Sequence, residues 1–290
     1  MKIKTWAAML LSTAALVTVV GCGGKSAGSS TASKGGSITA SGSSALLPLV
    51  KDAAEKFKAK HPEVSVTLNA GGSGTGLKQV AEGSVDIGNS DIEAEKKLPA
   101  EKAKGLVDHK VCVITVAPVV HKDIGLKVKS LSKKQLQDVF TATVKNWKEV
   151  GGPDVPVVLV SRPATSGTRA LFKEFALDGR EEASNQSLET DDSGSLMQNI
   201  SQTKGAIGYV ALSYLKGNDN VTPLGIDGVM PTLENTYSGQ YPVWGYEHMY
   251  TKGEAKGAVK DFLNYIVSDE YGVEIEKQGY GVTSKMKVSR

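Results

Sequence analysis

Three turns that contain serine, together with one aspartate, are the parts of this sequence best suited to binding a small anion. Ser44, Ser73 and Ser166 each lie between an expected strand and an expected helix, and Asp91 ends another strand. The first backbone N–H groups of a helix have no acceptor within the helix, so they can donate to an oxyanion together with nearby hydroxyls. A capped helix that binds nothing is the alternative for each turn taken alone.

An arginine makes the third of these turns the strongest candidate for binding an anion. Residues 157–160 form an apolar strand, and Arg162 follows before a helix that begins near residue 167. Pro163 disfavours helical geometry at Arg162, so the guanidinium leaves from an extended or turning backbone. Ser166 is a good N-cap, Gly167 leaves the first free N–H groups open, and Thr168 adds a hydroxyl.

The glycine-rich second turn, residues 70–76, is not a known catalytic loop. Lys78 is not followed by Ser or Thr, which excludes a nucleotide-binding P-loop. The second residue after Ser73 is Thr75, so Ser73 does not lie in a Gly-x-Ser-x-Gly nucleophile elbow. A plain flexible loop is the alternative here.

Strands alternate with helices around these turns, which predicts an α/β fold. In the first part of the chain we expect strands at 37–40, 64–68 and 85–91, and helices at 49–57 (with Ser43 or Ser44 as N-cap) and 77–82. In such folds ligands gather beyond the carboxyl ends of the strands, where the serines and Asp91 lie.

Two longer strands predict a division into two lobes. The apolar run 111–120 is interpreted as a crossing to a second lobe, and 241–250 as the strand that returns. Between and after them we expect helices at 131–140, 193–200 and 258–267, and a strand at 205–210. Two crossings produce a cleft that can close on a ligand by a hinge motion.

The first residues have the pattern of an export signal. Lys2 and Lys4 precede the apolar segment 6–20, which is short for a membrane span. The segment ends in Val19-Val-Gly-Cys22, which resembles a bacterial lipobox and implies cleavage before a lipid-modified Cys22. An ordinary secretory signal is the alternative. We expect a signal peptide at 1–21 and a lipid-anchored, Gly/Ser-rich flexible tether at 22–36.

Composition excludes several function classes. The formal charge is +3, and removing Lys2 and Lys4 lowers it to +1, which argues against nucleic acid as a partner. Cys112 lies in an apolar run and is expected to be a buried strand thiol. The four histidines are scattered without metal-ligand spacing. We therefore expect no metal, no cofactor and no catalytic residues, and a monomer.

Six motifs together resemble the phosphate-binding proteins of bacterial phosphate ABC importers (PstS type). They cover the whole expected mature domain and are found at residues 42–48 (GSSALLP), 71–76 (GGSGTG), 85–91 (VDIGNSD), 140–147 (FTATVKNW), 162–168 (RPATSGT) and 205–209 (GAIGY). The resemblance implies a two-lobed type II periplasmic-binding-protein fold. Each lobe would be a mixed, mostly parallel sheet flanked by helices, with lobe I at 37–116 and 243–290 and lobe II at 117–242.

The resemblance also implies a function and its residues. It implies a lipoprotein outside the cytoplasm that binds inorganic phosphate between the lobes and delivers it to ABC permease subunits in the inner membrane. The implied phosphate contacts are Ser44, Ala45 through its N–H, Ser73, Asp91, Arg162, Ser166, Gly167 and Thr168. Other members carry threonine at the position of Ser44. Lys145 and the helix start at Ser193 and Ser195 are further candidates that stay open.

Asp91 would separate phosphate from sulfate. An ionised carboxylate only accepts hydrogen bonds, and phosphate near neutral pH still has a proton to donate, whereas sulfate has none. Sulfate would leave two acceptors facing each other in a buried site. For Asp91 the alternative is a salt bridge to Arg162 or a helix cap. For the protein the alternatives are a binder of sulfate, molybdate or tungstate, a phosphatase or serine hydrolase, and an envelope sensor or adhesin.

Overall fold

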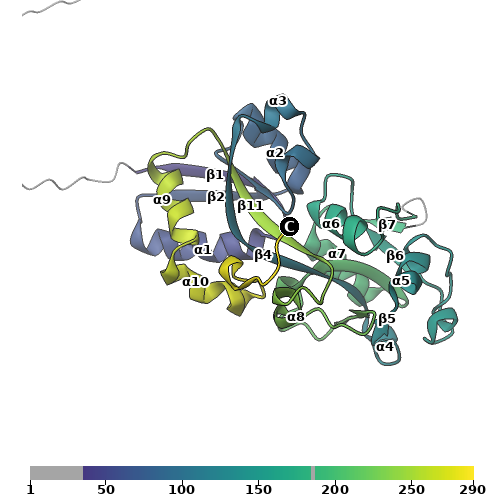
Figure 1. Cartoon of the computed structure of the whole chain (residues 1–290). Coiled ribbons are helices and arrows are strands. Elements are labelled where there is room, and N and C mark those ends of the chain that lie inside the picture. The colour runs from purple at the N-terminus through teal and green to yellow at the C-terminus, as the bar shows by residue number, and fades with distance from the viewer. Residues whose placement is uncertain (1–34, 184–186) are drawn as a thin grey trace, which may run out of the picture. The chain divides into compact units, whose positions relative to one another are not determined.

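One mixed sheet carries the site residues (Figure 1). The computed structural model describes residues 35–183 and 187–290, which belong to one compact unit. The strands are β1 Ser37–Gly42, β2 Ser65–Ala70, β3 Ile87–Ser90, β4 Leu106–His121, β6 Val158–Ser161, β7 Ser187–Glu189, β8 Ala206–Ala211, β9 Val221–Pro223 and β11 Trp244–Lys252. A separate small sheet pairs β5 Ser130–Leu131 with β10 Gly225–Ile226. The predicted signal peptide and Cys22 lie outside the described residues.

The sheet is parallel at both ends and antiparallel in the middle. Its order is β2-β1-β3-β11-β4-β8-β6-β7, with β9 also paired to β4. β1 runs parallel to β2 and β3, and β6 runs parallel to β7 and β8. All pairings of β4 and β11 are antiparallel. The parallel ends place several strand-to-helix turns at common sheet edges.

Ten α-helices are assigned in the described part of the chain. They are α1 Leu47–Lys60, α2 Ser73–Glu82, α3 Ala100–Ala103, α4 Lys122–Gly125, α5 Lys133–Phe140, α6 Gly167–Phe175, α7 Ser193–Gln202, α8 Leu233–Tyr237, α9 Gly257–Ile266 and α10 Asp269–Ile275. Figure 1 shows α1, α9 and α10 near β1 and β2, and α5, α6 and α7 near β6 and β7. Within residues 35–183 and 187–290, no helix combines the length and apolar composition needed to cross a membrane.

Strand β4 connects the two halves of the sheet. Its first ten residues, 106–115, pair with β11, and its last six, 116–121, pair with β8 and β9. The whole strand from Val111 to Val120 is buried, as the apolar run predicts. Cys112 lies in this run as a buried free thiol, which confirms its predicted role as a strand residue.

Both faces of the sheet near β11 are covered. Met249 packs with residues of α1 and α9, whereas the next residue, Tyr250, packs with Leu77 and Val80 of α2. Successive strand residues point to opposite faces, so this alternation places helices on both sides of the sheet. The burial of both faces explains why the central strands are apolar with few polar interruptions.

Two predicted helix starts are wrong. The helix near residue 49 begins at Leu47 with Leu46 as its N-cap, and the Ser43 hydroxyl instead accepts a hydrogen bond from the Leu46 N–H (3.1 Å) in the preceding turn. The second helix begins at Ser73, four residues before the predicted start. The Gly72 N-cap has a φ of 82°, which glycine adopts without strain. The run of glycines therefore opens a helix that the pattern alone had placed in a loop.

Candidate anion-binding site

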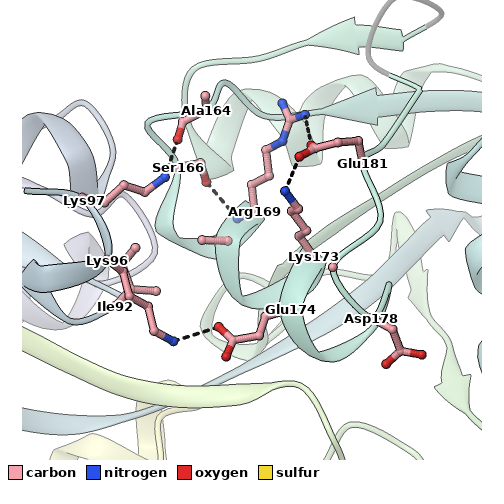
Figure 2. A pocket seen from close by; sticks show the side chains of 12 residues that line it. Ile92, Lys96, Lys97, Ala164, Ser166, Arg169, Lys173, Glu174, Asp178 and Glu181 are labelled. Carbon is pink, nitrogen blue, oxygen red and sulfur yellow. Dashed lines mark hydrogen bonds and ion pairs between the residues drawn. The ribbon is translucent and has the colours of Figure 1, made fainter.

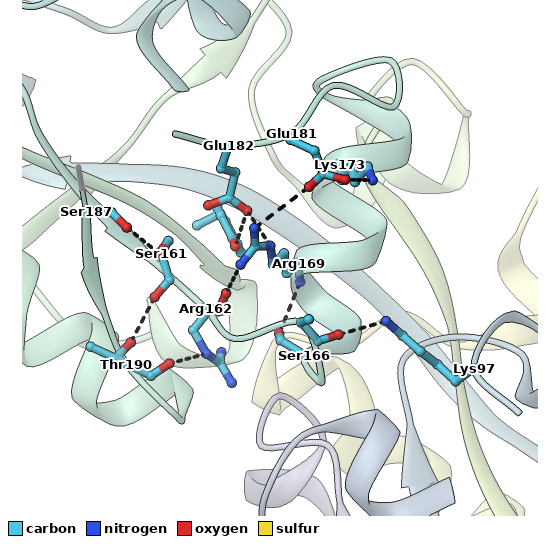
Figure 3. Close-up of polar contacts among 12 residues, drawn as sticks. Lys97, Ser161, Arg162, Ser166, Arg169, Lys173, Glu181, Glu182, Ser187 and Thr190 are labelled. Carbon is cyan, nitrogen blue, oxygen red and sulfur yellow. Dashed lines mark hydrogen bonds and ion pairs between the residues drawn. The ribbon is translucent and has the colours of Figure 1, made fainter. Parts of the chain in front are cut away.

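Arg162 lies at the centre of a buried polar cluster. It directly follows β6, and only 1% of its surface is exposed. Its Nε donates to the Thr190 carbonyl (3.1 Å) and its Nη2 to the Asp191 carbonyl (2.9 Å), as Figure 3 shows for Thr190. These bonds hold the guanidinium in one orientation. Its remaining donors face hydroxyl groups rather than a carboxylate.

Ser44 meets Arg162 from a distant part of the chain. Arg162 Nη2 donates to Ser44 Oγ (3.1 Å), and the Ser193 N–H donates to the same oxygen (3.2 Å). Ser193 Oγ lies 3.1 Å from Ser44 Oγ and also accepts from Arg162 Nη1 (3.3 Å). The neighbouring Ala45 is fully buried. The turn after β1 and the start of α7 are therefore brought together around the guanidinium.

A second group of contacts surrounds Asp91. Thr168 Oγ1 donates to Asp91 Oδ2 (2.6 Å), and the Asp91 N–H donates to Ser73 Oγ (3.0 Å). Asp91 Oδ1 is buried and has no hydrogen-bond partner among the described residues. In that part of the chain Asp91 forms neither an ion pair with Arg162 nor a helix cap. The carboxylate thus keeps acceptor capacity for another donor.

Ser166 confirms the predicted N-cap of α6. Its Oγ accepts from the Arg169 N–H (3.1 Å), as Figures 2 and 3 show. A hydroxyl has one donor and two acceptor positions, so the Ser166 O–H can still donate to a ligand. Gly167 and Thr168 are the first two helical residues, whose N–H groups have no intrahelical acceptor. These donors lie beside Asp91, because Thr168 bonds to it.

Gly167 fits because it has no side chain. A Cβ added there would lie 2.2 Å from Ser73 Oγ and 2.9 Å from Asp91 Cβ. We expect Gly167→Ala to displace both groups and to lower the free energy of unfolding by about 1–3 kcal/mol. Urea unfolding measures this change. Gly272→Ala in α10 is the matched control, since nothing lies within 4 Å of its added Cβ. Equal midpoints for the two variants would contradict the tight packing described here.

Of the three open candidates, Ser193 joins the predicted residues and Lys145 and Ser195 do not, and one further residue joins them. Ser193 joins the cluster, and so does Tyr214, whose hydroxyl donates to the Ser44 carbonyl (2.7 Å). Burial raises the pKa of Tyr214 to about 12, so it stays a donor. Sequence reasoning missed Tyr214. Lys145 is exposed and bonds through its backbone to Glu149 and Val157, and Ser195 pairs with Asp192, so neither joins the cluster.

Cations line a pocket next to this cluster. The pocket of about 580 Å³ includes Ser166, Lys96, Lys97, Arg169 and Lys173 (Figure 2). Lys97 Nζ donates to the Ala164 carbonyl (2.8 Å). Burial lowers the pKa of Lys97, and the nearby charges of Arg169 and Lys173 lower it further. Glu174, Asp178 and Glu181 line the same pocket, and Lys96 pairs with Glu174 while Lys173 pairs with Glu181.

Buried acidic and aromatic groups support Arg169. Its Nε lies 3.2 Å from Glu182 Oε1, which also accepts from Tyr209 OH (2.7 Å). Arg169 also donates to the Arg162 carbonyl, so the network in Figure 3 connects the two arginines. In the described residues, no group of three or more His, Cys, Asp and Glu side chains could hold a metal ion. Among the predicted site residues, Asp91 is the carboxylate, and the others supply hydrogen-bond donors.

Comparisons with known proteins identify the family. The PBP superfamily domain matches residues 27–270. The sequence is 49% identical to Phosphate-binding protein PstS of Bacillus subtilis (strain 168), over 97% of this chain and 95% of that protein. The chain belongs to the PstS family. A phosphate ABC transporter substrate-binding protein from Clostridium perfringens, solved with bound phosphate, is 32% identical, with a TM-score of 0.77 and coverage of 85% of this chain and 99% of that chain.

Membership of the PstS family confirms the predicted resemblance and the α/β periplasmic-binding-protein fold. An ABC-type phosphate transport receptor from Vibrio cholerae shares the fold with a TM-score of 0.66, covering 84% of this chain and 99% of that chain. PstS proteins are periplasmic or extracellular binding proteins, and they are not enzymes. The predictions that the chain is not an enzyme and works outside the cytoplasm are confirmed at this level.

Proposed function

We propose that this protein binds inorganic phosphate at the cluster around Arg162 and Asp91 and delivers it to an ABC-type import permease. The observation that carries the proposal is the burial of the predicted site residues in two groups of contacts, around Arg162 and around Asp91, which the segment 162–168 connects. Hydroxyls, helix-start N–H groups and a guanidinium supply donors, while Asp91 alone supplies a ligand-facing acceptor. Phosphate has both the oxygens for the donors and the proton for the acceptor. The proposed contacts are Ser44, Ala45, Ser73, Asp91, Arg162, Ser166, Gly167 and Thr168.

We place this site between two lobes, 37–116 with 243–290 and 117–242. β4 pairs with β11 up to residue 115 and with β8 from residue 116, and this change of partner strand supports the division. Contacts across the proposed boundary surround the cluster, such as the Gly74 N–H donating to the Thr165 carbonyl (2.9 Å). Arg162, Asp91 and Ser73 are each at most 2% exposed, so the lobes must separate to admit an ion. Hinge opening about β4 and β11 would provide that access.

The remaining parts of the proposal concern location and partners. Lipid modification of Cys22 would hold the domain at the membrane through the flexible tether 22–36. Acyl chains contribute about 0.8 kcal/mol per buried methylene, so a multiply acylated cysteine is a firm anchor. A monomer on such a tether can reach the permease while it exchanges ligand with the surroundings. Mass spectrometry of the membrane-bound protein would detect the lipid on the Cys22 peptide.

Calorimetric titration of the purified domain tests the proposed ligand. We expect phosphate to bind in a one-to-one complex, and sulfate and molybdate to bind at least about tenfold more weakly because neither offers a proton to Asp91 at neutral pH. Tighter binding of sulfate, molybdate or tungstate would assign the site to another oxyanion. Heat that continues after saturation with a phosphate ester would indicate turnover and would overturn the binding-only proposal.

A further inference from the structure

Glu247 is a carboxyl group in the middle of β11, next to Asp91. The antiparallel register pairs His248 of β11 with Ser90 of β3, where β3 ends. Glu247 and Asp91 are the next residues in this direction, and their carboxyl groups interact. Directly opposed residues of antiparallel strands place their side chains on the same face, close to each other. The pairing of β11 with β4 has a register shift between Glu247 and His248. Such bulges redirect a side chain locally.

The two carboxyl groups are buried together, and three of their four oxygens lack a donor among the described residues. Glu247 is fully buried and Asp91 is 2% exposed. Among the described residues, Asp91 Oδ1 and both Glu247 oxygens have no hydrogen-bond partner. Two ionised carboxylates are both acceptors, so they cannot bond to each other, and two adjacent buried negative charges without partners are strongly unfavourable. One proton between the groups removes one charge and turns the contact into a hydrogen bond.

The contacts of the pair decide which group holds the proton. Asp91 accepts from Thr168 Oγ1, and a hydrogen bond to the charged form stabilises that form. Glu247 has no comparable donor among the described residues. Burial raises the pKa of Glu247 well above its usual range, and the negative charge of Asp91 raises it further.

The titratable groups around Glu247 come from three elements. Asp91 follows β3, Cys112 lies opposite Glu247 on β4, and Tyr280 lies in the segment after α10. Burial raises the pKa of both the Cys112 thiol and the Tyr280 hydroxyl, so neither adds a charge at neutral pH. Within the part of the chain that the structure describes, no lysine or arginine forms an ion pair with Glu247. The surroundings therefore favour its neutral form.

We propose that Glu247 keeps a proton at neutral pH and donates a hydrogen bond through it to Asp91, which holds the ionised Asp91 in a fixed orientation as an acceptor. The role in ligand selection rests on the proposed binding of phosphate. Glu247 acts through Asp91 and is a positioning residue. A carboxylate has about four lone-pair positions, so Asp91 can accept from Thr168, from Glu247 and from the proton of phosphate at the same time.

Infrared spectroscopy tests the protonation directly. We expect the wild-type protein at neutral pH to show the carbonyl band of a protonated carboxylic acid, and Glu247→Gln to lack it. The difference spectrum of the two proteins isolates this band from the other carboxyl groups. This measurement requires no ligand, so its result is independent of whether phosphate binds. A difference spectrum without the band would overturn the proposal.

Two variants of similar shape test the donor role. In Glu247→Gln the amide N–H can still donate to Asp91, so we expect phosphate affinity within about threefold of wild type and unchanged selectivity against sulfate. In Glu247→Met the unbranched chain is kept but the donor is lost, so Asp91 loses the hydrogen bond that orients it. We expect about a 10- to 100-fold weaker affinity for phosphate and reduced selectivity. Equal affinities for Met and Gln variants would overturn the donor role.

The pH profile separates this role from packing. Burial and the charge of Asp91 raise the pKa of Glu247 well above its usual range, so Glu247 loses its proton only as the pH rises through that raised pKa. Deprotonation would place a second negative charge beside Asp91. The phosphate affinity of wild type should therefore fall relative to that of Glu247→Gln as the pH rises, since glutamine cannot ionise. Parallel profiles would overturn the proposal, whereas failure of wild type to bind phosphate at any pH would refute only the proposed function.

Discussion

Replacing Asp91 with asparagine is expected to reduce the preference for phosphate over sulfate by about 10- to 100-fold. The carboxylate can only accept, so sulfate leaves it facing another acceptor inside a site where it is 2% exposed. The amide introduced by Asp91→Asn can rotate to present an N–H group, which removes this penalty. Competition titrations with both anions measure the ratio of affinities.

Asp192→Asn provides the matched control for that change. Asp192 caps α7 by accepting from the Ser195 N–H (2.9 Å), close to the Arg162 side of the cluster. Its substitution removes the same charge without altering the acceptor that faces the ligand. We expect its selectivity to match that of wild type. If Asp91→Asn also left the selectivity unchanged, Asp91 would not be the discriminating residue.

Truncating Arg162 to alanine is expected to weaken phosphate binding by about 100-fold or more, compared with about tenfold for Ser73→Ala. The guanidinium is a charged, forked donor, whereas Ser73 contributes a single neutral hydroxyl. Titration calorimetry of both variants gives the comparison. Comparable losses would mean that the charge contributes less than the geometry indicates.

A conservative variant separates the charge of Arg162 from its scaffolding role. Arg162 also binds the Thr190 and Asp191 carbonyls, so truncation leaves these acceptors without their donor. Arg162→Lys keeps the charge but cannot reproduce the fork. We expect it to bind phosphate with an affinity between those of wild type and Arg162→Ala. Denaturant unfolding of all three proteins shows how much of each loss comes from the fold.

The alternation of apolar strands and capped helices was sufficient to predict the turns at Ser44, Ser73 and Ser166. Ser44 and Ser73 follow β1 and β2, which are parallel and end at a common edge. Ser166 follows β6, which runs antiparallel to β1, so only contacts made in the folded protein bring it to the other two serines. The start of α2 could not be predicted, because glycines have low helix propensity and only contacts made in the folded protein hold them in a helix. Gly74 shows this, since its N–H donates to the Thr165 carbonyl.

Tyr214, which the sequence analysis missed, and Ser193, which it left open, both reach the site from distant parts of the chain. Tyr214 meets Ser44 across 170 positions of the chain, and Ser193 meets it across 149. No local pattern encodes such pairings. Glu247 did leave a signal, because a carboxyl group interrupts a strand whose neighbours are otherwise apolar, aromatic or His248. A charged residue within a buried strand usually has a specific partner, and this one lies beside Asp91.

Many contacts across the proposed lobe boundary use main-chain atoms. Gly74 donates its N–H to the Thr165 carbonyl, Lys97 binds the Ala164 carbonyl, and Tyr214 binds the Ser44 carbonyl. Every amino acid supplies a carbonyl oxygen, so mutations at residues 164, 165 and 44 leave these acceptors in place. The side chains at the proposed lobe boundary can therefore change during evolution while these hydrogen bonds between the lobes persist. Divergent relatives can close their lobes in the same way even when they share few side chains at the boundary.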